Sequence, residues 1–229
     1  MVFRKMHDIA EGMNQMLEIK SVVSGKTVRF PAFIENFSDS FNVGWNQEET
    51  FGRIDPVLSY RSTTRQISLG ISVLAPNKNK GIENLLEYSK LIQMLYPSYS
   101  QPLNEGSSLG RTITAPPIMK VRLMNYIQSA DGTDGLYGAI QGLKFNPDFN
   151  MGHFVRNDGT LIPKKFTIDF SFVPQHSSEI GSNDHGQFLS STFPYGETQP
   201  GSDMGSADSP TNPNSGAAAD QALGMSNGE

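Results

Sequence analysis

The 229-residue sequence contains no cysteine. Disulfide bonds, zinc–thiolate sites and cysteine nucleophiles are therefore excluded, and stability must come from the core or from neighbouring subunits. Hydrophobic residues make up 37 % and charged residues 18 %, and both shares are low for a globular protein. Glycine, serine, asparagine, threonine and proline take their place, which is typical of a turn-rich β protein. No run of 18 apolar residues occurs, so we expect no membrane-spanning helix.

Lysine and arginine are missing from the last part of the chain. The last base is Lys165, and eight of the 23 acidic residues follow it, so the first 165 residues carry a net charge of +3 and the remainder −8. Residues 177–229 are also rich in glycine, serine and proline, which predicts an acidic extended arm with no fold of its own. No basic stripe of the kind that grips phosphate backbones occurs, so we expect no specific nucleic-acid binding.

Several segments alternate between apolar and polar residues, as half-buried strands do. The clearest are residues 66–73, 118–127 and 165–173, and further strands are expected at 27–36, 37–45 and 136–145. Because Pro31 has no backbone N–H to donate, we expect the strand at 27–36 to lie at a sheet edge or to contain a bulge. In the strand at 37–45, Phe37, Phe41, Val43 and Trp45 share one face, whereas residues 49–60 are expected to be irregular.

Apolar residues at spacings of three and four predict two helices, over residues 6–17 and over residues 80–95. The second should bury a stripe formed by Ile82, Leu85, Leu86, Ser89, Ile92 and Leu95. The expected fold class is therefore mainly β with one packed helix (α+β). We divide the chain into an N-terminal helix and linker (1–26), a β-rich domain (27–176) and the acidic arm (177–229).

Four motifs resemble catalytic or binding sites, and each lacks the context that its chemistry requires. Gly106–Gly110 matches G-x-S-x-G around Ser108 but has no strand before the serine and no helix after it. Gly25-Lys26-Thr27 resembles the end of a phosphate-binding loop, but a strand follows it. Asp131–Gly135 fits a turn better than a calcium loop. The polar residues His176, Glu179, Asp184 and His185 match no known metal spacing. We expect no enzyme activity, metal or cofactor.

Five segments carry a family resemblance. They are FIENFSDSFNVGWNQEETFGRIDPVLSYRSTTRQISLGISV (33–73), NLLEYSKLIQMLYPSY (84–99), APPIMKVRLMNYI (115–127), GLYGAIQGLKFNPDF (135–149) and IPKKFTIDFSFVPQH (162–176). Together they resemble small structural proteins at the baseplate end of the tail tube of contractile-tailed bacteriophages, around the tube initiator. The resemblance covers about residues 27–176, and the arm after Ser177 departs from it.

The resemblance implies a tail-tube-like β-sandwich or half-barrel with a packed helix, and a virion protein made in the host cytoplasm. Six copies would form a ring whose strands close a barrel around a lumen, through which DNA only passes. The ring would contact tail-tube, hub and baseplate wedge proteins. Within the shared block, Trp45, Arg53, Asp55 and Arg65 are our candidates for fixing a corner or a subunit interface. Trp45 could equally lie in the core, and Arg53 with Asp55 could be an ordinary surface pair.

Two other functions stay open. The chain could be a virion-associated module that binds a receptor or glycan, for which Tyr96, Tyr99, Tyr137 and Tyr195 are the available aromatic residues. It could also be a hydrolase built around Ser108. Purified protein that stays monomeric and binds glycans would favour the first, and loss of activity in a Ser108→Ala variant would be the minimum evidence for the second.

Overall fold

A computed structural model describes residues 15–31, 33–100, 112–190 and 192–196. Within these ranges the chain forms one helix, α2 (Lys78–Met94), and eleven strands. The strands are β1 (Met16–Ser21), β2 (Thr27–Pro31), β3 (Phe33–Glu48), β4 (Val57–Leu74), β5 (Ser98–Tyr99), β6 (Ile113–Ala115), β7 (Met119–Leu123), β8 (Leu136–Pro147), β9 (His153–Val155), β10 (Leu161–Pro163) and β11 (Lys165–Gln175). No helix among the described residues is long and apolar enough to cross a membrane.

Seven of the strands form one antiparallel sheet in the order β2-β1-β7-β8-β11-β4-β3, and α2 packs against it. The expectation of a mainly β fold with one packed helix is confirmed. β2 and β3 are the two edge strands, yet one residue separates Pro31 from Phe33 in the chain. Two α-carbons so close in sequence lie within about 8 Å of each other. The sheet must therefore curl until its edges meet at that end, as in a half-barrel.

The core lies on the face of the sheet that α2 covers. Phe166, Ile168, Phe170 and Phe172 of β11 point into it in strict alternation, as the sequence pattern predicts. Tyr88 of α2 stacks on Phe145 of β8 with ring centres 4.8 Å apart, and it also meets Phe166 edge-on. Such aromatic contacts add to the free energy gained from burial and fix how the helix lies on the sheet.

The helix lies where the sequence predicts it, but its buried face differs from the prediction. The structure buries Gly81, Asn84, Tyr88, Leu91 and Met94, while Leu86 and Ile92 of the predicted stripe remain exposed. Two contacts set this rotation. A Cβ on Gly81 would lie 2.6 Å from the Ile162 side chain, so only glycine allows this approach, and the Asn84 amide donates to the Leu74 carbonyl at 3.3 Å.

Three other expectations need correction. Met16 and Leu17 belong to β1 rather than to a helix, because their register with β2 and β7 completes the sheet; the rest of the predicted helix lies outside the described residues. Residues 27–36 form parts of two strands on opposite edges, separated just after Pro31. Residues 57–60 are not irregular, because they pair with residues 45–48 as the outer part of β4.

Gly138 offers a test of this packing. A Cβ at this position would lie 2.3 Å from the Val173 carbonyl oxygen and 2.8 Å from the Pro174 backbone. Because backbone atoms cannot yield cheaply, Gly138→Ala should lower the free energy of unfolding by about 1–3 kcal/mol in urea titrations. Gly44→Ala is the matched strand control, since its nearest contact would be 3.5 Å, and it should change stability by less than about 0.5 kcal/mol. Equal stability of the two variants would contradict the packing described here.

Candidate interaction site at the projecting hairpin

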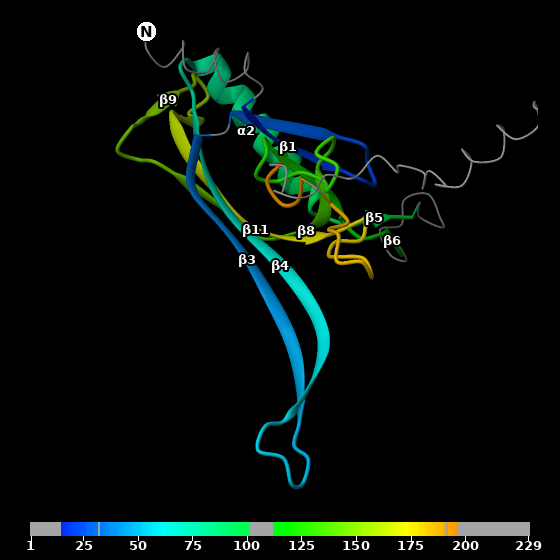
Figure 1. The fold of residues 1–229 in the computed structure, drawn as a ribbon. Coiled ribbons are helices and arrows are strands. Elements are labelled where there is room, and N and C mark those ends of the chain that lie inside the picture. The colour runs from blue at the N-terminus through cyan, green and yellow to red at the C-terminus, as the bar shows by residue number, and fades with distance from the viewer. Residues whose placement is uncertain (1–14, 32, 101–111, 191, 197–229) are drawn as a thin grey trace, which may run out of the picture.

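A long hairpin leaves the sheet where β11 stops supporting it. β11 pairs with β4 from Leu74 as far as Ile67, and beyond that point β3 and β4 pair with each other alone. The outer ladder runs from Ser40 opposite Gln66 to Glu48 opposite Val57, and residues 49–56 close its tip. Figure 1 shows this hairpin extending far from the rest of the fold.

One face of the hairpin is apolar, and beyond Phe41, whose ring meets Phe193 edge-on, nothing among the described residues from outside the hairpin covers it. The register places Phe41, Val43 and Trp45 on the same side as Leu58 and Tyr60, continuous with the core side of the sheet. Val43 and Trp45 are each 52 % exposed and Tyr60 is 58 % exposed. The opposite side carries Ser40, Asn42, Asn46, Ser59 and Ser62. We call the first side the hairpin face. Its pattern is that of a half-buried sheet whose covering layer is missing.

A buried ion pair marks the base of the hairpin. Arg65, the second residue past the last β4–β11 pair, donates from Nε to Asp39 Oδ1 at 3.0 Å and from Nη2 to Oδ2 at 2.6 Å. Each side chain is 2 % exposed. The guanidinium also lies over the rings of Phe41 and Phe193, at 5.2 and 5.4 Å from their centres. Arg65 Nη1 is buried without a hydrogen-bond acceptor in the described structure, and the two rings supply part of the missing attraction.

The chain after the sheet returns to this ion pair. The Tyr195 hydroxyl donates to Asp39 Oδ2 at 3.2 Å, and the Asn125 amide holds the Tyr195 carbonyl at 3.1 Å. The hydroxyl groups of Ser190 and Thr192 both donate to the Ala130 carbonyl. We call Ser190 together with residues 192–196 the strap. It connects the turn after β7 to the base of the hairpin, so the first part of the predicted acidic arm packs on the body.

Burial changes the ionisation of two groups beside the pair. It raises the pKa of the Tyr195 hydroxyl, and the Asp39 carboxylate raises it further, so the phenol stays a hydrogen-bond donor. Burial also lowers the pKa of His176, and the Arg65 charge adds to this effect. The His176 ring meets Phe193 edge-on with centres 5.4 Å apart. The site therefore favours a neutral histidine against the strap.

The four residues predicted from the sequence lie at three different places. Arg65 is buried at the base, Trp45 is exposed on the hairpin face, and Arg53 and Asp55 lie in the loop at the tip. Trp45 does not lie in the core that the described residues form; it meets Tyr60 edge-on at 5.7 Å instead. No hydrogen bond or ion pair joins Arg53 to Asp55 in the described structure. A role for the four residues in a subunit interface stays a prediction.

Sequence reasoning missed Asp39 and Phe193, and it named Tyr195 only as an aromatic residue of a possible receptor or glycan site. For Asp39 a signal existed: by the period of two it lies on the same face as Phe37 and Phe41, where a carboxylate needs a buried partner. Phe193 and Tyr195 are separated from the hairpin by more than 120 residues. No local pattern links them to Arg65.

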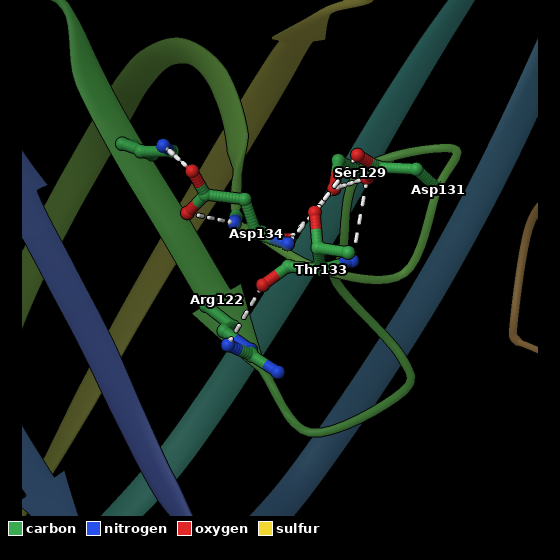
Figure 2. A network of polar contacts seen from close by, with 7 residues as sticks. Arg122, Ser129, Asp131, Thr133 and Asp134 are labelled. Atoms are coloured by element: carbon green, nitrogen blue, oxygen red, sulfur yellow. Dashed lines mark hydrogen bonds and ion pairs between the residues drawn. The ribbon is translucent and has the colours of Figure 1, made fainter.

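The turn at Asp131–Gly135 is confirmed as a turn. Figure 2 shows Asp131 accepting from the Ser129 hydroxyl and from Thr133, while Arg122 donates to the Thr133 carbonyl at 3.2 Å. These hydrogen bonds, that from Ser129 first, lower the pKa of Asp131 to about 2. Among the described residues no three His, Asp or Glu side chains converge as metal ligands. The strand expected after Gly25-Lys26 is present, because Thr27 begins β2. Ser108 lies outside the described residues.

Comparisons with known proteins give a distant structural neighbour. No family model matches the chain, and no curated protein matches it. A chain in the cryo-EM structure of the anti-feeding prophage baseplate, 6-fold symmetrised, aligns with a TM-score of 0.28 and 9 % identity. The alignment covers 69 % of this chain and 87 % of the other. A TM-score this low does not establish a shared fold.

The buried ion pair can be tested with Arg65→Met. This change leaves the Asp39 carboxylate buried without its counter-charge, so it should lower the free energy of unfolding by about 3–5 kcal/mol. The double variant Arg65→Met/Asp39→Leu should recover part of this loss in a urea double-mutant cycle. Arg29→Met is the control, because its pair with Glu18 is exposed and should contribute less than about 1 kcal/mol. A small effect at Arg65 would show that the pair is hydrated.

The environment of His176 predicts a dependence on pH. Its folded-state pKa lies below the ordinary value of 6.5, so the unfolded chain binds more protons in that range. The free energy of unfolding should therefore fall as the pH drops through about 6.5 and level off below the lowered folded-state pKa. His176→Phe keeps a ring against Phe193 and should flatten this slope in urea titrations between about pH 7.5 and 5.5. The exposed His185→Phe is the control, and an unchanged slope in His176→Phe would contradict the assignment.

Proposed function

We propose that this chain is a structural, non-enzymatic subunit of the tail tube or baseplate of a contractile-tailed phage. It would form or nucleate a ring, of six copies by the family resemblance, that continues the tail tube and connects it to the baseplate. Its partners would be further copies of itself and neighbouring tube, hub and wedge proteins. DNA would only pass through the ring.

The observation that carries the proposal is the hairpin face. An isolated two-stranded hairpin is marginally stable in water, and this one adds exposed Val43, Trp45, Leu58 and Tyr60. Large apolar surfaces on projecting elements are typical of protein interfaces, where aromatic side chains serve as anchors. A subunit that assembles would cover this face with a neighbour.

The alternative role, a receptor- or glycan-binding module, relies on exposed aromatic side chains. The Tyr195 hydroxyl is hydrogen-bonded to Asp39, and the Lys120 ammonium lies 4.9 Å from the centre of the Tyr137 ring. Tyr96 and Tyr99, 67 % and 53 % exposed, remain from the predicted set. These two tyrosines offer a smaller exposed surface than the hairpin face does, so we favour assembly over receptor or glycan binding.

Size-exclusion chromatography with light scattering and negative-stain microscopy tests the proposal. Wild-type protein should give rings, stacked tubes or a mass near six times 25.1 kDa. Trp45→Thr/Tyr60→Thr keeps strand propensity but removes the aromatic anchors, so it should shift the protein towards monomer. Asn46→Thr/Ser59→Thr on the opposite side of the same hairpin is the matched control and should assemble as wild type. Wild-type monomer at every concentration, with binding on a glycan array, would favour the module instead.

A further inference from the structure

The helix α2 carries a second apolar face that the described part of the chain leaves partly exposed. Ile82, Leu85, Leu86 and Ile92, followed by Tyr96 just past the end of the helix, recur at helical spacing beside the buried face, and Ile82 and Leu85 are half-buried. Leu86 is 56 % exposed, Ile92 37 % and Tyr96 67 %. We call this set the helix stripe. A surface helix is expected to bury one stripe against its own core, and among the described residues nothing covers the exposed part of this second stripe.

The hairpin face and the helix stripe cannot cover each other within one molecule. α2 packs on the body, whereas the hairpin extends away from the body (Figure 1). Contact between them therefore needs two copies, with the hairpin of one on the helix of the next. Such a contact joins two different surfaces, and it repeats head to tail until it closes into a ring or continues as a filament.

The outer hairpin and the helix have comparable lengths, and the hairpin face supplies a substantial part of the area that an interface needs. Residues 57–66 of β4 span about 33 Å at about 3.3 Å per residue, and the 17 residues of α2 span about 25 Å at 1.5 Å per residue. A fully covered aromatic side chain buries about 150–250 Å². Trp45, Tyr60 and their aliphatic neighbours, each about half exposed, thus supply on the order of 500 Å². Standard interfaces bury about 800 Å² per partner, which the rim around both surfaces can complete.

We infer that the helix stripe is the docking site for the hairpin face of a second copy of this chain. The inference rests on the proposed function and deepens it, because it names the surface that receives the hairpin. Trp45 and Tyr60 are the anchors on one side, and Leu86 and Ile92 are the residues that they cover on the other.

A mixing experiment tests the inference. Trp45→Thr/Tyr60→Thr has an intact helix stripe, and Leu86→Gln/Ile92→Gln, which keeps helix propensity at exposed positions, has an intact hairpin face. Each variant alone should lose the wild-type assemblies and elute as a monomer. An equimolar mixture should form one contact per pair of molecules and give a heterodimer of twice 25.1 kDa by light scattering. Glu83→Gln, at an exposed position on another side of α2, is the control and should assemble as wild type.

The absence of cysteine allows a direct check of the contact. Chains with Tyr60→Cys and chains with Leu86→Cys, mixed and oxidised, should give a disulfide-linked heterodimer in excess over the two homodimers. Normal assembly of Leu86→Gln/Ile92→Gln together with failure of the hairpin variant would overturn this inference but leave the proposed function standing. Wild-type protein that never leaves the monomer would overturn both.

Discussion

The hairpin depends on the ion pair between Arg65 and Asp39 at its base. On the covered side of β4 the apolar series Val73, Ile71, Leu69 and Ile67 ends at Arg65, so the core stops where this charge begins. A charge in a dry position is tolerated only with a counter-charge and hydrogen bonds, and Asp39 on the neighbouring strand supplies both. A slip of one residue in the pairing would move Arg65 to the polar side and leave Asp39 buried alone. The pair thus fixes the register of the strands beyond it, although it adds little net stability compared with apolar side chains.

The strap extends this constraint to the other half of the sheet. Phe193 lies over the guanidinium and Tyr195 donates to Asp39, while Asn125 and Ala130 hold the strap to the turn that follows β7. The base of the hairpin is therefore held from β3, β4 and a segment more than 120 residues later. Beyond it the ladder has one partner strand and no covering layer. Stability must fall along the hairpin from base to tip, because local stability follows the number of buried apolar contacts.

Strands and helix could be predicted from the sequence because their patterns are local. Alternation over residues 66–73 and 165–173 identifies two neighbouring strands, and the periodicity over 80–95 identifies α2. Pairing over long distances is not local, so neither the split of residues 27–36 between two sheet edges nor the contact of Arg65 with Phe193 could be predicted. The rotation of α2 could not be predicted either. It is decided by Gly81 against Ile162 and by Asn84 bonding Leu74, two contacts that the helix periodicity does not contain.

The predicted buried face of α2 and the possible core position of Trp45 failed for the same physical reason. The helix has apolar residues on two sides, and the sequence pattern selects the side that the fold leaves open. Trp45 fits a core by its alternation with Phe41 and Val43, and the fold places it half-exposed on a hairpin that no described segment covers there. In both cases the local pattern is that of buried surface, and the described part of the chain leaves much of that surface exposed. Local rules that a single chain does not satisfy are expected at functional sites. A strand face and a helix face are left exposed in the same way and cannot meet within one molecule, which is why we propose an assembly of several copies as the unit that covers both.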